Sequence, residues 1–154
     1  MERGFFKIKK GVVMKESSFA RDLRDRLKGK VHWTRIENLA SPGIPDINFF
    51  NGRDIWVELK IIKNKKVSFR PSQVSWARER NNYGGEVYVF ARDSNELCIA
   101  KITDLTEDLV YNEGGSRLAH IHITNLRKLG VCFVKPFNWN SIIQNVILRL
   151  GFNS

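Results

Sequence analysis

The chain has little of what disulfide-built and membrane-spanning proteins need. It contains two cysteines and four prolines, and no apolar run approaches the roughly 20 residues of a membrane span. Cys98 and Cys132 lie in apolar, strand-like runs, so we expect two reduced, buried thiols, with a disulfide or a metal site as the alternative. The N-terminal segment lacks a sustained apolar core and a small-residue cleavage site. We therefore expect no signal peptide and a cytoplasmic location.

Acidic residues are the other shortage. Asp and Glu total 16 against 26 Lys and Arg, which gives a formal net charge of +10 at pH 7. Such an excess favours a polyanionic partner and raises affinity for nucleic acid. The sequence shows no basic amphipathic helix with a Trp/Phe face that would bind an acidic membrane. We expect nucleic acid as the partner and no membrane.

The remaining composition is that of an ordinary globular protein. At 154 residues, with 42% hydrophobic and 27% charged residues, the chain is long enough for one domain that buries a sizeable core. We expect a single domain over residues 1–154.

Residues 41–60 carry the most specific signal in the sequence. Asp46–Phe50 and Ile55–Ile62 are rich in Ile, Val, Phe and Trp, and Asn51-Gly52 between them indicates a turn. Side chains alternate along a strand, so Glu58 and Lys60 project from one face. Val57, Leu59 and Ile61 point to the other face, which is apolar enough to be core.

The loop length decides whether Asp46 joins Glu58. A two-residue loop would place Asp46 on the opposite face of the sheet from Glu58. A three-residue loop pairs Phe50 with Asp54 and sets Asp46 directly opposite Glu58, and a bulge near Gly52 has the same effect. If this stretch is a functional site, we therefore predict an odd loop or a bulge.

Such a pairing would have a clear chemical use. Two carboxylates about 5 Å apart at Cβ, with the Lys60 ammonium beside them, suit a hard divalent cation. Mg²⁺ usually takes one or two carboxylates and keeps several waters. The pattern favours Asp46 and Glu58 as metal ligands.

These residues resemble the signature of the PD-(D/E)XK nuclease superfamily, here Pro45-Asp46, eleven residues, then Glu58-Leu59-Lys60. Further short motifs are similar to the VRR-NUC branch: Gly43–Asp46, Trp56–Lys60, and Pro71–Gln73 with Trp76. Arg35 and Ser41 are similar to residues of the archaeal-type Holliday junction resolvases. The resemblance covers residues 16–91, about half of the chain.

The resemblance implies an α/β fold with a restriction-endonuclease-like core. A central mixed β-sheet would be flanked by helices within residues 12–102, and a C-terminal α/β extension would follow over residues 103–154. Nucleases of this type carry a Glu on the first helix that faces the metal site, which implies this role for Glu16. A first-turn carboxylate favoured by the helix dipole is the alternative for Glu16, and Glu37 is the competing acid.

The resemblance also implies roles for individual residues. The catalytic set would be Glu16, Asp46, Glu58, Lys60 and Gln73, and the metal set Asp46, Glu58, Glu16 and the backbone carbonyl of Leu59. We expect DNA contacts from seven residues: Arg24, Arg35, Ser41, Lys63, Lys65, Lys66 and Arg70. A solvated hairpin tip is the alternative for the three lysines.

The function implied is a Mg²⁺-dependent, structure-selective DNA endonuclease that resolves Holliday junctions, with Mn²⁺ able to substitute. Two coordinated cuts imply a homodimer. Stand-alone VRR-NUC proteins are often phage-encoded, and the location would then be the host cytoplasm. The alternatives are a nicking, flap-processing or restriction-type endonuclease on duplex DNA, an inactive DNA-binding module of the same fold, and a structural hairpin with surface charges.

Periodicity predicts the other elements. Helices are expected over Met14–Lys28, Pro71–Asn82, Asp104–Tyr111 and Asn140–Leu150, and strands over Val31–Ile36, Glu86–Arg92, Leu97–Ile102 and Val131–Val134. His120 and His122 alternate with isoleucines on a predicted strand. We expect surface strand residues there, with a zinc-binding pair as the alternative.

Overall fold

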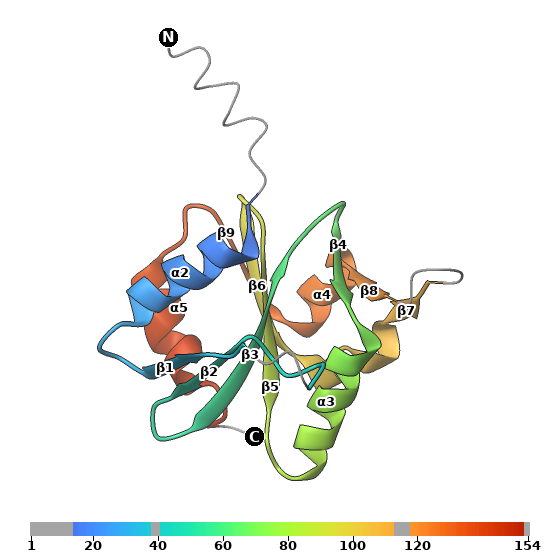
Figure 1. Cartoon of the computed structure of the whole chain (residues 1–154). Coiled ribbons are helices and arrows are strands. Elements are labelled where there is room, and N and C mark those ends of the chain that lie inside the picture. The colour runs from blue at the N-terminus through green and yellow to red at the C-terminus, as the bar shows by residue number, and fades with distance from the viewer. Residues whose placement is uncertain (1–13, 38–40, 113–117, 153–154) are drawn as a thin grey trace.

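The computed structural model describes residues 14–37, 41–112 and 118–152 (Figure 1). Its centre is a six-stranded mixed sheet in the order β1-β2-β3-β5-β6-β9. The strands are β1 (His32–Arg35), β2 (Ile47–Phe50), β3 (Asp54–Ile61), β5 (Val87–Arg92), β6 (Glu96–Lys101) and β9 (Val131–Val134). A second sheet has the order β4-β8-β7, formed by Lys66–Phe69, Ala119–His122 and Val110–Tyr111.

Helices cover both faces of the central sheet. Figure 1 shows α2 (Glu16–Leu27) and α5 (Trp139–Asn145) on one side, and α3 (Pro71–Asn82), α4 (Ile123–Leu129) and the small sheet on the other. Each side has its own core. One unites α2 and α5 with alternate residues of β2, β3, β5 and β6; the other unites α3, α4 and the small sheet with the opposite faces of β5 and β6.

The strand pairing explains why the centre of the sheet is apolar. β3 and β5 are parallel, and β4 and α3 form the connection between them. Parallel strands are buried on both faces and favour continuous hydrophobic runs. All six residues of β5 are buried, and so are the first five of β6. The expected mixed sheet with helices on both sides is confirmed.

The β2–β3 hairpin has the predicted three-residue loop. Phe50 pairs with Asp54 and Ile47 pairs with Val57. Asn51 N–H donates to the Arg53 carbonyl at 3.2 Å, and Gly52 adopts φ +73° between them. Glycine accepts this left-handed conformation without a Cβ clash. The register places Asp46, the residue before β2, opposite Glu58.

Two sequence expectations for the C-terminal part differ from the structure. The helix expected over Asp104–Tyr111 is absent: two short 3-10 turns, Ile102–Asp104 and Thr106–Asp108, lead into β7. The helix expected over Asn140–Leu150 ends at Asn145 and resumes as a 3-10 turn over Ile147–Arg149, because Val146 leaves the helical conformation at φ −123° and ψ −63°.

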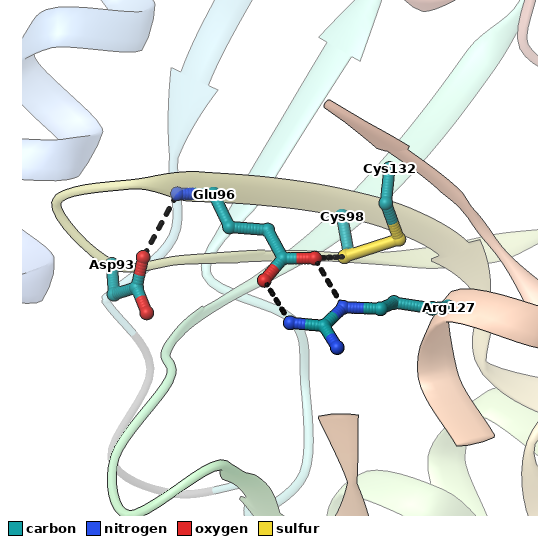
Figure 2. The surroundings of a disulfide bond; sticks show 5 residues. All are labelled: Asp93, Glu96, Cys98, Arg127 and Cys132. Carbon is teal, nitrogen blue, oxygen red and sulfur yellow. Dashed lines mark hydrogen bonds and ion pairs between the residues drawn. A yellow bond between two sulfur atoms is a disulfide. The ribbon is translucent and has the colours of Figure 1, made fainter. Parts of the chain in front are cut away.

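The expectation of two reduced thiols was also wrong. Cys98 of β6 and Cys132 of β9 are directly opposite in the antiparallel pairing and form a disulfide (Figure 2). Each cysteine was placed correctly in a strand, but their pairing depends on the β6–β9 register. His120 and His122 lie on β8 as expected, and His122 Nδ1 accepts from Thr124 N–H at the start of α4.

Within the described residues, no helix has the length and apolar character needed to cross a membrane. The expectation about a signal peptide concerns residues that lie outside those described.

Candidate active site

Asp46 is held where β1, β2 and β3 meet. Its Oδ2 accepts a hydrogen bond from the Leu59 backbone N–H at 2.9 Å, and its carbonyl accepts from Ile36 N–H at 2.8 Å. The carboxylate is therefore tied to β3 and the main chain to the end of β1. One side-chain oxygen of Asp46 takes no part in the bond to Leu59.

Glu58 is a buried acid in the middle of β3, with only 3% of its surface exposed. Its Oε2 accepts from Gln73 Nε2 at 2.7 Å and lies 3.6 Å from Lys60 Nζ. Its Oε1 is buried and has no hydrogen-bond partner among the described residues. Buried polar atoms are almost always paired, so this oxygen calls for an explanation.

Gln73 joins Glu58 to Lys60. It is 5% exposed in the first turn of α3, and its Oε1 accepts from Lys60 Nζ at 3.0 Å and from Arg70 N–H at 2.9 Å. One amide thus orients an acid and an amine that lie two residues apart on β3. The sequence expectation that Gln73 faces Lys60 is borne out by this contact.

The electrostatics of Glu58 follow from its burial. Desolvation, followed by the nearby Asp46 carboxylate, raises the pKa of Glu58 to about 9, against an opposing effect of Lys60. Burial favours the neutral form of an acid, and a like charge adds to that. The group is therefore protonated at neutral pH unless a cation compensates.

Glu16 belongs to the same electrostatic cluster. It is the first residue of α2, and partial burial together with Asp46 raises the pKa of Glu16. Lys60, Lys63 and Arg35 oppose this rise. The competing acid, Glu37, lines a hollow that Asp46 also lines.

The residues present fit a divalent cation. Asp46 and Glu58 offer hard oxygen ligands from facing positions of neighbouring chain segments, and Glu58 Oε1 has no hydrogen-bond partner among the described residues. A divalent ion is bound in proteins by carboxylate and carbonyl oxygens and by water. A cation there would satisfy the buried oxygen and reduce the repulsion that raises the pKa of Glu58.

A hollow of about 390 Å³ opens beside Asp46. Ser41, Arg70 and Ser72 are among its lining residues. Gly43 brings the loop against the start of α3, since a Cβ there would lie 2.2 Å from the Ser72 carbonyl oxygen. Two residues expected to contact DNA, Ser41 and Arg70, thus border the acidic cluster.

The other expected DNA contacts are spread over two regions. Lys63 and Lys65 lie in the exposed turn between β3 and β4, where Asn64 and Lys65 adopt positive φ angles of 52° and 61°, and the exposed Lys66 begins β4. Lys63 influences Glu16 electrostatically, so this turn borders the acidic cluster. Arg24 and Arg35 share a separate small hollow on the α2 side of β1.

Sequence reasoning passed over two neighbours of Arg24 and Arg35. Arg21 and Trp33 line the same hollow. The signal was present, because Arg21 precedes Arg24 by about one helical turn and Trp33 precedes Arg35 by one strand period. Neither residue belongs to a motif, so their proximity becomes visible only when α2 and β1 lie side by side in the fold.

A further cluster of possible metal ligands occurs at the other end of the sheet. Ligand atoms of Glu96, Cys98 and Cys132 lie within 4.8 Å of one another. Figure 2 shows why they do not form a metal site here: the sulfurs are bonded to each other, and Arg127 takes both oxygens of Glu96.

Comparison with known proteins supports the fold. The sequence matches no protein-family model and no curated protein. Among solved structures, the chain is similar to Hjc, a Holliday junction resolvase from the archaeal hyperthermophile Archaeoglobus fulgidus. The TM-score is 0.53 and the sequence identity 22%, with 74% of this chain and 93% of that chain covered. At this identity the likeness establishes a restriction-endonuclease-like α/β fold.

Proposed function

We propose that the protein is a Mg²⁺-dependent, structure-selective DNA endonuclease that resolves Holliday junctions as a homodimer. The observation that carries the proposal is the facing placement of Asp46 and Glu58. Glu58 Oε1 is buried without a hydrogen-bond partner among the described residues, and Lys60 Nζ lies 3.6 Å from Glu58 Oε2. The similarity in fold to an archaeal Holliday junction resolvase supports the choice of substrate.

Asp46, Glu58 and the Leu59 carbonyl would hold the metal ion, with Glu16 close enough to fix a water or a second ion. Bound there, Mg²⁺ or Mn²⁺ would lower the pKa of a water and polarise a phosphoryl oxygen. The Leu59 N–H bond keeps Asp46 oriented, and the Gln73 bond does the same for one oxygen of Glu58. Both carboxylates are thus positioned before any ligand arrives.

Lys60 would supply positive charge where the phosphodiester gains negative charge. Its ammonium donates to Gln73 Oε1 at 3.0 Å and retains two further donors for water or phosphate. A preorganised charge of this kind stabilises a transition state because it needs no rearrangement during the reaction. Gln73 is a positioning residue, since it fixes Lys60 relative to Glu58.

The surface around the cluster would bind the DNA backbone. Lys63, Lys65 and Lys66 are exposed at the end of the β3–β4 connection, and Ser41 and Arg70 line a hollow together with Asp46. Arg24 and Arg35 would extend the contact along α2 and β1. The net charge of +10 agrees with a polyanionic partner. A cytoplasmic location and a branched substrate belong to the same proposal.

The decisive experiment compares cleavage of a synthetic four-way junction by the wild type, Asp46→Ala and Lys60→Ala. With Mg²⁺ we expect the wild type to cut and both variants to lose at least 100-fold in rate, since Asp46→Ala removes a metal ligand and Lys60→Ala removes a positive charge at the reacting phosphate. Junction affinity should change little. Lys128→Ala, an exposed lysine on α4, is the matched control. Undiminished cutting by either active-site variant would refute the assignment.

A substrate panel separates the alternatives. Linear duplex, flap, nick and four-way junction are each incubated with Mg²⁺ and with EDTA. Preferential cutting of flaps or plain duplex would indicate a flap-processing or restriction-type nuclease. An inactive binding module would bind DNA without cutting it. In titration calorimetry it would also show no Mn²⁺ binding that is lost when Asp46 or Glu58 is replaced.

A further inference from the structure

A small basic hollow lies on the α2 side of β1, apart from the acidic cluster. It has a volume of about 210 Å³ and is lined by Ser17, Ala20, Arg21, Arg24, Trp33 and Arg35. Three of the six lining residues are arginines and none is acidic. The hollow therefore concentrates positive charge from two different elements.

Local structure explains why these side chains converge. Ser17, Arg21 and Arg24 recur at intervals of four and three residues on α2, which puts them on one face of the helix. Trp33 and Arg35 are two residues apart on β1 and project to the same side of the strand. The hollow is thus built on a helix and a strand rather than on a loop.

The charges around the hollow are only partly compensated. Arg24 Nη2 contacts Asp25 at 3.4 Å, but both side chains are largely exposed, and an exposed pair of this kind contributes little. No hydrogen bond or ion pair of the Arg21 or Arg35 side chain is recorded among the described residues, apart from the long-range effect of Arg35 on Glu16. Guanidinium groups bind phosphate through paired N–H donors, so an anion would relieve their mutual repulsion.

The hollow adjoins the proposed catalytic site. Ser17 follows Glu16 directly at the start of α2, and both Ser17 and Arg35 line the hollow. A nucleic-acid strand crossing the acidic cluster would therefore bring a neighbouring phosphate past Arg35 toward Arg21. Trp33 supplies a flat apolar wall, which suits a sugar or base attached to that phosphate.

We infer that this hollow binds one backbone phosphate of the cleaved DNA strand, next to the scissile phosphate, through Arg21, Arg24 and Arg35. The inference rests on the proposed nuclease function and adds a specific subsite to it. The site fixes the position of the strand relative to Asp46 and Glu58. Arg21 provides a contact made only to the phosphate backbone, so it confers no sequence preference.

The test uses Asp46→Ala as the uncut background and measures four-way junction binding as a function of salt. Adding Arg21→Ala should weaken binding about tenfold, since a hydrogen bond to a charged group is worth about that factor or more. The slope of log affinity against log salt should fall by about 0.9, as expected for one lost phosphate contact. Arg21→Lys should restore the slope and only part of the affinity, because lysine keeps the charge and loses the paired donors. Arg149→Ala, an exposed arginine next to the C-terminal turn, is the control and should change neither quantity.

A phosphate walk locates the contact. Neutral methylphosphonate replaces one phosphate at a time on the strand around the cut mapped with the wild type. One position near the cut should weaken binding by the Arg21-containing protein and leave the Arg21→Ala variant unaffected. Equal binding by the Arg21→Ala and Arg149→Ala variants, or an Arg21 effect spread evenly over all positions, would overturn the subsite. Junction cleavage by the wild type tests the proposed function separately: cleavage with no Arg21-dependent phosphate position overturns the subsite alone, whereas absence of cleavage overturns both.

Discussion

Glu58 is the residue whose environment most clearly serves something other than stability. It is 3% exposed, its Oε1 has no partner among the described residues, and burial raises its pKa to about 9. In the unfolded chain this carboxyl group has an ordinary pKa of 4.5 and is ionised at pH 7. Keeping it neutral in the folded protein at pH 7 therefore lowers the free energy of unfolding. Functional sites commonly retain such unfavourable groups.

Glu58→Gln should therefore stabilise the metal-free protein while abolishing cleavage. The amide is neutral at every pH, and its carbonyl oxygen still accepts from Gln73 Nε2. We expect a gain of about 1–3 kcal/mol in the free energy of unfolding at pH 7 in EDTA, measured by urea denaturation. Glu79→Gln, at an exposed position on α3, should leave stability unchanged. A loss of stability in Glu58→Gln would show that the buried acid is satisfied by contacts within the protein.

At the scale of elements, the loop before β2 and the start of α3 form one unit. Gly43 has φ +91°, and a Cβ at this position would lie 2.2 Å from the Ser72 carbonyl oxygen. Gly84 has nearly the same φ, +92°, and a Cβ there would meet nothing within 4 Å. The two glycines therefore separate the effect of backbone conformation from that of close packing.

Gly43→Ala should destabilise the protein clearly more than Gly84→Ala. Both substitutions force alanine into a left-handed conformation, at about 1 kcal/mol each. Gly43→Ala adds a backbone clash, so we expect a total of about 2–4 kcal/mol. Junction cleavage should also fall, since the clash displaces Asp46 relative to Gln73. Thermal melts and cleavage rates check this, and equal melting temperatures for the two variants would contradict it.

How far the sequence predicts the structure depends on whether an element is determined locally. The β2–β3 hairpin was predictable because Asn51-Gly52 marks the turn and alternation fixes which residues share a face, and α3 begins and ends where Pro71 and Gly84 suggest. Asp104–Tyr111 has helical composition, but Leu105 and Leu109 pack into the core and the segment forms 3-10 turns instead. The Cys98–Cys132 pairing depends on the β6–β9 register, which no local pattern reveals.

The candidate site divides in the same way. Asp46, Glu58 and Lys60 follow from strand alternation and one loop length. The double contact of Gln73 with Glu58 and Lys60 depends on how α3 packs against β3, which is a long-range property. The orphaned oxygen of Glu58 and the basic hollow at Arg21 are visible only in three dimensions.

Another contact between elements predicts a pH effect on stability. Arg127 of α4 donates to both carboxylate oxygens of Glu96 on β6, at 2.7 and 2.8 Å (Figure 2). These bonds lower the pKa of Glu96 below its ordinary 4.5. The ionised form is thus stabilised in the folded state, and this contribution is present above pH 4.5 and is lost as the pH falls through the lowered pKa.

Glu96→Gln should accordingly be less stable than the wild type at pH 7 and should approach it as the pH is lowered below 4.5. Chemical denaturation at a series of pH values measures the difference. Glu79→Gln, at an exposed position on α3, serves as the control. A stability difference that stays constant down to pH 3 would show that the Arg127 contact does not depend on the charge of Glu96.

For the molecule as a whole, the proposed junction resolution requires two coordinated cuts. A four-way junction has two equivalent strands to cleave, and a two-fold homodimer presents two equivalent sites. We expect light scattering to give twice the 17.9 kDa mass of the chain. A cruciform plasmid should yield linear product with the wild type and mainly nicked product when an excess of Asp46→Ala is mixed in, since mixed dimers hold one active site. A complex that contains one protein chain per junction would contradict this prediction.

The position of β9 and α5 limits how far the chain can be shortened. β9 pairs with β6, and Ile142 and Ile143 of α5 pack in the same core as Phe19 and Leu23 of α2. A protein trimmed after residue 102 would keep every acid and amine of the cluster yet leave Leu97 and Ile99 uncovered and β6 as an open edge. Such a fragment would be prone to aggregate. A shortened version of this protein must therefore retain β9 and α5.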